Sequence, residues 1–391
     1  MSFEEAKQVL QMDEGGQNLY DHLASPSLDW AKSVGSLFVK PDEEPAGVPG
    51  PALLSDAVLF EAAGVSFGRT ATYRLHLSLK KHAEALDAAY EGLKFWGKVT
   101  AVGCDYYVCY ARTPEDPADA DPAAVEGRAG ANKYTYWAAT GAAAPWVQLP
   151  NVTAAQLVVA SQIRRLLTGS LAACVPSYPP FPGDEAALLR AMVGRITAAC
   201  AIAPAGTFEA NEDGEVEPVK NDDGEVDAPR KDCAELCEGA AWAHFELGVN
   251  SLGRCTKLPE PEDDEGYEPP EGDEVAEPLG GVGEEEGKDE WSFRAAPGGA
   301  GTTAGSWCKA TSMDWPGAFA VAGGKQFCNV YVGNGLPASA GPYSPPLPGD
   351  ICGEWAVPEE EVAEEVVPGV FPSEGKDVVA DPTPPAEEEE E

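Results

Sequence analysis

The sequence has little of what enzymes use for acid–base chemistry. Only four histidines occur in 391 residues, so few side chains have an ordinary pKa near neutrality. It contains neither a phosphate loop ending in Gly-Lys-Ser/Thr nor a His-Glu-x-x-His zinc motif. The glycines of Gly64-Val-Ser-Phe-Gly68 have the wrong spacing for a nucleotide loop and fit a turn before a helix. We therefore expect no catalytic residues and no cofactor.

The cysteines lack the spacing of a metal site. Cys233 and Cys237 are separated by three residues, but no second pair lies nearby, and His244 alone does not complete four ligands. Acidic strings such as Asp263-Asp264-Glu265 lack the alternating pattern of a calcium loop. No metal site is predicted, and the ten cysteines are interpreted as reduced thiols of an intracellular protein.

Long apolar runs and basic clusters are also missing. No stretch approaches the roughly 20 apolar residues of a membrane span, and no N-terminal apolar run indicates a signal peptide. The 26 Lys and Arg residues are outnumbered by 66 Asp and Glu residues. Because phosphate binding needs clustered cations, we expect neither nucleic acid nor membrane as a partner.

The negative charge is concentrated in two places. Residues 209–290 hold 28 acidic and 6 basic side chains, a net charge of −22, and residues 353–391 hold 14 and 1, a net charge of −13. The remaining residues carry only −5 of the total of −40. Such acidic segments repel themselves and bury little apolar surface, so we interpret them as disordered loops and a disordered tail around a nearly neutral body.

These shifts in composition divide the chain into five predicted parts. They are an N-terminal helical segment and linker (1–52), the main body (53–208), an acidic loop region (209–290) with a short ordered piece near 240–258, a C-terminal β-hairpin part of the body (291–352), and an acidic Pro/Glu-rich tail (353–391).

Four helices are predicted inside the body. Residues 53–64 read as a short helix, and an apolar stripe from Leu75 to Leu93 indicates a second one after Gly68-Arg69. The clearest helix begins at Thr153, where Gln156 completes a capping box, and it is expected to end at Gly169 with Arg164 and Arg165 in its last turn. Asp184 caps a further helix that contains Gly194, which suggests a close helix contact there.

Short segments rich in β-branched and aromatic residues are predicted as strands. They are residues 94–100, 106–111, 133–138, 146–149, 317–321 and 326–332, with 242–247 as a strand or a short helix. The last two strands form a hairpin about Gly323-Gly324. The fold class predicted is therefore α+β, with mainly antiparallel strands, several helices and long irregular segments.

Aromatic residues accumulate in and beside these strands. Tyrosine and tryptophan pack in cores, and they also anchor protein interfaces. Most of this group is expected in the core, and the group as a whole gives our interface candidates: Tyr106, Tyr107, Tyr134, Tyr136, Trp137, Trp146 and Tyr331.

Read together, the ordered segments resemble the radial spoke head 4/6 family. The likeness covers roughly residues 54–210, 247–258 and 315–335. The segments that carry it are Phe60–Arg69, Thr72–Lys81, Lys94–Lys98, Asp105–Val108, Asn132–Trp137, Pro145-Trp146, Leu149–Thr153, Tyr178–Gly183, Leu189–Ala191, Gly253–Thr256, Trp315–Ala318 and Tyr331–Gly333. Residues 127–130 add length before Asn132 relative to the family pattern, so whether the chain is of the 4 type, the 6 type or a divergent paralog stays open.

The resemblance implies a structural role in the axoneme of motile cilia and flagella. Members of this family sit in the head of the radial spoke, which relays mechanical signals between the central pair and the dynein arms on the outer doublets. The implied partners are a sibling 4/6 subunit, spoke head component 9 and MORN-repeat spoke proteins, with transient contact to the central pair apparatus. The implied localisation is cytoplasm, cytoskeleton and ciliary axoneme.

Two other functions are considered beside this one. An acidic adaptor or chaperone-like module would bind basic proteins through its acidic runs, with strong salt dependence. An enzyme with an unfamiliar site would need a deep polar pocket in the body, with His82 or Asp105 beside Arg69 as its reactive groups.

Overall fold

The computed structural model describes residues 48, 50–116, 121–211, 216–220, 229, 231–259, 268–276, 279–282, 291–296 and 306–339. The predicted N-terminal segment lies mainly, and the predicted acidic tail wholly, outside these residues. Of the acidic loop region, residues 212–215, 221–228, 230, 260–267, 277–278 and 283–290 lie outside them. The described helices are α3 (Leu53–Ala62), α4 (Arg69–Ala85), α5 (Ala154–Gln162) and α6 (Glu185–Cys200), with two short 3-10 turns, η2 (Glu235–Cys237) and η3 (Gly239–Ala241). None of the helices in these ranges is both long and apolar enough to cross a membrane.

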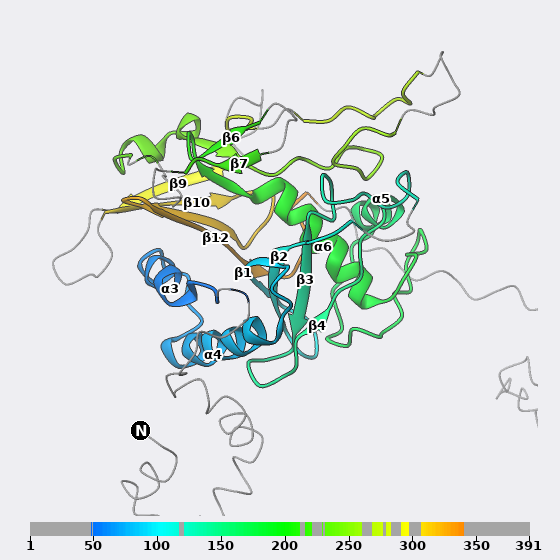
Figure 1. Ribbon diagram of the computed structural model, residues 1–391, viewed down its shortest axis with the longest axis horizontal. Helices are drawn as coiled ribbons and strands as arrows, with labels where there is room; N and C mark the ends of the chain where they lie inside the picture. The colour runs from blue at the N-terminus through cyan, green and yellow to red at the C-terminus, as the bar shows by residue number, and fades with distance from the viewer. Residues whose placement is uncertain are drawn as a thin grey trace, which may run out of the picture. The chain divides into compact units, whose positions relative to one another are not determined.

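One large sheet organises the described residues (Figure 1). Its eight strands run in the order β4-β3-β2-β1-β12-β11-β10-β9. They are β1 (Glu91–Val99), β2 (Tyr106–Arg112), β3 (Tyr134–Ala139), β4 (Val147–Gln148), β9 (Trp291–Ala296), β10 (Trp307–Ser312), β11 (Ala318–Gly323) and β12 (Gln326–Gly333). The remaining strands form two small two-stranded sheets, β5 (Ile202–Pro204) with β8 (Trp242–His244), and β6 (Phe208–Ala210) with β7 (Val216–Pro218).

The sheet is assembled from two antiparallel blocks. Within each block, strands adjacent in sequence pair with each other, as hairpins require. The blocks meet where β1 lies parallel to β12, with Gly97 opposite Tyr331. More than 200 residues separate these two strands in the sequence, so the parallel junction fixes the ends of the described fold to each other.

Helices cover both faces of the sheet (Figure 1). Alternate residues of β2 and β3 point to opposite sides. Tyr106 and Tyr136 pack with α5 and α6 in one core, whereas Cys109 and Trp137 pack with α3 and α4 in another. A third, smaller core joins β10 and β11 to β5, β8 and the 3-10 turns around the fully buried Trp242.

The capping signals of α5 and α6 are confirmed. The Thr153 hydroxyl accepts from the Gln156 backbone N–H at 3.2 Å, and the Gln156 side chain accepts from the Thr153 N–H at 3.1 Å. Asp184 accepts from the Ala187 N–H at 3.0 Å. Helix α6 approaches α5 at Gly194. A methyl group added there would lie 3.7 Å from the Leu157 side chain of α5. The predicted close helix contact is present.

Two predicted helix ends are wrong. Helix α5 stops at Gln162 instead of running to Gly169, so Arg164 and Arg165 lie beyond it. From Ile163 the chain is extended, which buries Ile163 and Leu167 and lets the Leu167 carbonyl accept from the Val102 N–H. Tertiary burial therefore overrides helix propensity in this segment.

The stripe from Leu75 to Leu93 is likewise divided between two elements. Helix α4 ends at Ala85, and Leu93 lies on β1. Asp87 separates them, since its carboxylate accepts from the Ala89 N–H and holds a turn. The predicted helix was too long because apolar residues of β1, including Leu93, happen to continue the helical spacing of α4.

The predicted strands are present, within one to three residues at their ends. The hairpin about Gly323-Gly324 is confirmed by pairing of Gly323 with Gln326. Residues 242–247 contain the short strand β8. Strands β5, β6, β7, β9 and β10 were not predicted. Acidic residues lie close to β6, β7 and β9 in the sequence and masked their short alternating patterns.

Candidate functional site

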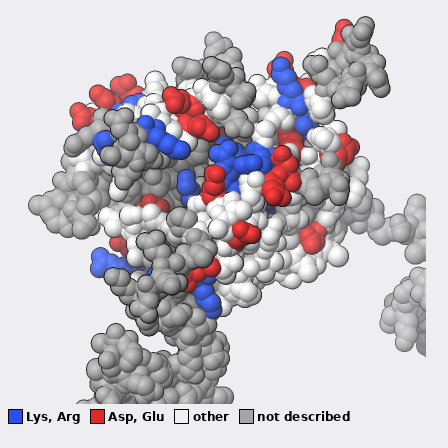
Figure 2. All heavy atoms as spheres, viewed as in Figure 1, with Lys and Arg blue, Asp and Glu red and all other residues white. Residues whose placement is uncertain are grey.

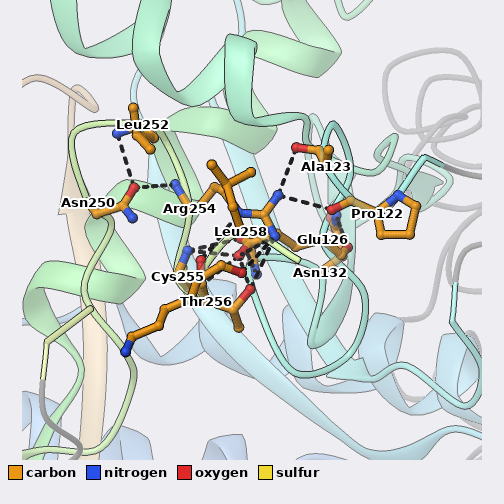
Figure 3. Close-up of polar contacts among 12 residues, drawn as sticks. Pro122, Ala123, Glu126, Asn132, Asn250, Leu252, Arg254, Cys255, Thr256 and Leu258 are labelled. Atoms are coloured by element: carbon orange, nitrogen blue, oxygen red, sulfur yellow. Dashed lines mark hydrogen bonds and ion pairs between the residues drawn. The ribbon is translucent and has the colours of Figure 1, made fainter. Parts of the chain in front are cut away.

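A buried ion pair between Glu126 and Arg254 fastens segment 250–258 to loop 121–133 (Figure 3). The Glu126 carboxylate lies 3.7 Å from the Arg254 guanidinium, with side chains only 3% and 4% exposed. Glu126 also accepts from the backbone N–H groups of Cys255 and Thr256 at 2.7–3.0 Å and from the Thr256 hydroxyl at 2.6 Å. Its negative charge is thus compensated by several donors, as a buried carboxylate requires.

Arg254 completes the same network on its other side. Its guanidinium donates to the carbonyls of Pro122 and Ala123 at 3.0 and 2.7 Å. Asn250 accepts from the Leu252 and Arg254 N–H groups and shapes the turn that presents the arginine. The segment 250–258 is therefore fastened to loop 121–133 by side-chain and backbone bonds rather than by apolar burial alone.

Asn132 continues this network toward helix α6. Its amide donates to the carbonyls of Glu126 and Val152, and its Oδ1 accepts from the Val152 N–H at 2.9 Å. Arg190 of α6 donates to the Ala131 carbonyl at 2.6 Å, and its guanidinium lies over the Tyr136 ring at 4.4 Å. Burial lowers the pKa of the Arg190 guanidinium, and the aromatic face provides partial compensation for its charge.

A second buried carboxylate, Glu185, fastens α6 to the sheet. It accepts from the Tyr106 hydroxyl at 2.7 Å, from the Thr168 hydroxyl and N–H at 2.7 Å, and from the Gly169 N–H at 2.8 Å. Burial by itself would raise the pKa of Glu185, but the hydrogen bonds from Thr168, Tyr106 and Gly169 hold it below its ordinary value. Burial also raises the pKa of the Tyr106 hydroxyl, so it stays protonated as the donor.

Segment 245–247 covers a row of tyrosines on β2 and β3. Tyr110 lies 5.0 Å from Tyr134 and 5.6 Å from Tyr136 between ring centroids. Glu246 accepts from the Tyr134 hydroxyl at 2.6 Å and pairs with Lys133 at 3.1 Å. Three hollows of about 50, 160 and 30 Å³ adjoin this carboxylate. The seam beside Glu246 is thus less tightly packed than the cores.

The three residues considered as reactive groups of an enzyme, His82, Asp105 and Arg69, lie in three separate sets of contacts. His82 lies between the rings of Trp137 and Trp146, at 5.2 and 5.8 Å, and burial lowers its pKa to about 4. Asp105 pairs with Lys98 at 2.6 Å, whereas Arg69 is exposed and 3.9 Å from Glu61. None of His82, Asp105 and Arg69 lines any of the three hollows beside Glu246.

Segment Gly64–Gly68 carries the letters of the Gly-x-Ser-x-Gly pattern of nucleophile elbows. That motif works at a sharp turn from a strand into a helix. Here it joins helix α3 to helix α4, with both glycines at positive φ, and the Ser66 hydroxyl accepts from the Gly68 N–H at 3.0 Å. The segment is a helix–helix turn, as predicted. Within the described ranges, no three His, Cys, Asp or Glu side chains are grouped so as to hold a metal ion.

The predicted interface aromatics fall into two groups. Tyr106, Tyr136, Trp137 and Tyr331 are at most 4% exposed and belong to the cores. Tyr107, Tyr134 and Trp146 are half-buried at the edges of those cores. The second group retains surface that a partner could contact, and for it an interface role stays a prediction.

Sequence reasoning missed the buried charges as a class. Glu126, Glu185, Arg190 and Arg254 were either unnoticed or quoted only within motifs. Arg190 offered the clearest signal, since it interrupts an otherwise apolar run from Ala186 to Val193. On the surface, charges of both signs lie together. Figure 2 shows Lys and Arg beside Asp and Glu near the centre of one face.

Comparison with known proteins gives matches along most of the chain. The model of the family described as radial spokehead-like protein matches residues 32–126 and 113–371. The chain is 32% identical over 345 residues to flagellar radial spoke protein 4 of Chlamydomonas reinhardtii, covering 80% of this chain and 72% of that protein. It is 30% identical to human radial spoke head protein 6 homolog A and 29% identical to human radial spoke head protein 4 homolog A, covering 80% and 78% of this chain. It spans about half of each human protein, 53% and 50%.

Proposed function

This chain belongs to the radial spokehead-like protein family, and we propose that it is a structural subunit of the radial spoke head in motile cilia and flagella. The observation that carries the proposal is the family match, which extends from residue 32 to residue 371. The algal relative is named as a flagellar spoke protein, and the two human relatives as spoke head proteins. We place the chain in the ciliary axoneme on this ground.

The buried hydrogen-bond networks of the body support a structural role over a catalytic one. Its buried carboxylates, Glu126 and Glu185, accept hydrogen bonds from the protein itself and hold distant segments together. Such networks make a scaffold resistant to local opening, because each buried charge would be left unpaired if one segment moved away. A subunit that relays force between the central pair and the dynein arms needs this kind of rigidity.

The finer assignments follow from the same premise. We propose that the body contacts a sibling 4/6 subunit, spoke head component 9 and MORN-repeat spoke proteins, and that it meets the central pair apparatus transiently. Tyr107, Tyr134 and Trp146 are the half-buried aromatics proposed for permanent contacts.

Co-purification from axonemes tests the proposal. The chain would carry an affinity tag in the organism that encodes it, and spokes would be extracted and fractionated by size. Mass spectrometry is expected to find the chain with other spoke proteins in near-equal amounts. Recovery outside the spoke fraction, with basic proteins released by about 0.5 M salt, would favour the acidic adaptor instead.

A further inference from the structure

The largest of the hollows beside Glu246 is cationic, although the chain carries a net charge of −40. It has a volume of about 160 Å³, and its lining includes Arg112, Arg128 and Lys133 with Glu246 as the one carboxylate. Arg112 is already engaged in another interaction, so we count only Arg128 and Lys133 as donors to a ligand. From the geometry of these residues we propose that the hollow binds carboxylate side chains of an acidic polypeptide segment on a partner protein.

Arg128 gives the first reason. Its Nε is excluded from solvent and has no hydrogen-bond partner within the described part of the chain. An unsatisfied buried N–H is costly, and a guanidinium matches a carboxylate through two parallel hydrogen bonds. Because Arg128 lines the hollow, a carboxylate bound there would pair with this guanidinium and compensate its charge.

Lys133 and Glu246 give the second reason. The Lys133 ammonium lies 3.1 Å from Glu246, which also accepts from the Tyr134 hydroxyl at 2.6 Å. Glu246 is thereby held in place. The Lys133 ammonium has three N–H groups and, among the residues that the structure describes, bonds only to the two carboxylate oxygens of Glu246, so it keeps donor capacity. An incoming carboxylate would share Lys133 with Glu246 and bond to Arg128.

The rest of the lining favours a polypeptide over a free anion. Val216, Phe245 and Leu247 line the same hollow, so the methylene groups of a glutamate or a neighbouring apolar side chain would find apolar contact. Nucleic acid is disfavoured because two available cations do not form the clustered basic surface that phosphate binding needs. A short acidic segment responds mainly to the charges within a Debye length of about 8 Å of the hollow.

The test uses the full-length chain and a fluorescein-labelled peptide of four glutamates and one leucine. Anisotropy at about 150 mM salt is expected to show binding of this peptide, and no binding of the same peptide with four glutamines. Arg128→Gln is expected to weaken binding about tenfold. The matched control is Arg74→Gln, an exposed arginine that does not line the hollow, and it should change affinity less than about twofold.

Glu246→Gln separates a binding role from a structural one. It keeps the shape and one acceptor oxygen but removes the negative charge, so affinity for the glutamate peptide is expected to rise about threefold or more. This readout remains informative if Arg128→Gln does not fold, which circular dichroism would reveal.

Three results would overturn the proposal. They are equal binding of the glutamate and glutamine peptides, an Arg74→Gln effect as large as that of Arg128→Gln, and full displacement of the peptide by inorganic phosphate at about its own concentration. The last would assign the hollow to phosphate. All of these measurements use purified protein, so their failure leaves the spoke head proposal untouched.

Discussion

The Glu126 carboxylate and the Arg254 guanidinium lie 3.7 Å apart in the interior, although 127 residues separate them in the sequence. Their side chains are 3% and 4% exposed, so neither charge can be solvated if the other is removed. This pair fastens segment 250–258 to the loop that precedes β3.

Glu126→Gln is therefore expected to destabilise the protein by about 3–5 kcal/mol, because it leaves Arg254 buried without its counter-charge. The matched control is Glu115→Gln on the exposed part of the same connection, with an expected change within about 0.5 kcal/mol. Urea unfolding followed by tryptophan fluorescence measures both. Equal midpoints for the two variants would show that the pair does not hold the segment.

Gly97→Ala is expected to open the junction between the two blocks of the sheet. Gly97 has a φ of 152°, and an added methyl group would overlap the backbone of Tyr331 on β12. A loss of about 3 kcal/mol or more is expected, with the ends of β1 and β12 losing amide protection in hydrogen exchange.

Gly141→Ala is the control for that substitution. Gly141 does not have positive φ, and a methyl group there meets no atom within 4 Å. Its stability should change by less than about 1 kcal/mol, in either direction. If Gly97→Ala behaves like Gly141→Ala, the parallel β1–β12 pairing is not a tight junction.

Glu185 gives a pH dependence with a definite sign. Its pKa in the folded protein lies below the ordinary value of 4.5, so its contribution to stability is fully present above that pH and is lost as the pH falls through the folded pKa. Glu185→Gln removes the contribution of the ionised carboxylate to the free energy of unfolding. The difference in unfolding free energy between the native protein and the variant should be constant from about pH 7 to pH 5 and shrink below pH 4.5. A difference that grows on acidification would contradict the hydrogen-bond assignment.

His82 acts in the same direction over a higher pH range. Burial between two tryptophans lowers its pKa from 6.5 to about 4, so the folded state favours the neutral ring. Stability is expected to decline as the pH falls from 6.5 toward 4, and His82→Gln should remove that part of the decline. Thermal melts at intervals of about half a pH unit would measure it. Parallel profiles for both proteins would mean that His82 titrates normally.

Local signals in the sequence were enough for most elements of the fold. Thr153 with Gln156 and Asp184 with Ala187 are contacts within one helical turn, so their geometry follows from the sequence alone. The hairpin at Gly323 is local for the same reason. The parallel pairing of Gly97 with Tyr331 could not be derived in this way, since it joins residues far apart in the chain.

The candidate site was harder to predict for the same physical reason. Most partners of Glu126 are backbone and side-chain groups of residues 254–256, and those of Glu185 lie on β2 and in the turn at 168–169. Nothing near either residue in the sequence indicates burial. The early end of α5 at Gln162 shows the reverse case, in which long-range burial of Leu167 overrides a local helical pattern.

The most direct test of the account is electron cryotomography of cilia that lack this chain, beside cilia rescued with a tagged copy. The account predicts spokes with density missing at the head, and recovery of that density with the tag located there after rescue. Complete spoke heads in the absence of the chain, with the tag located elsewhere in the cell, would contradict it.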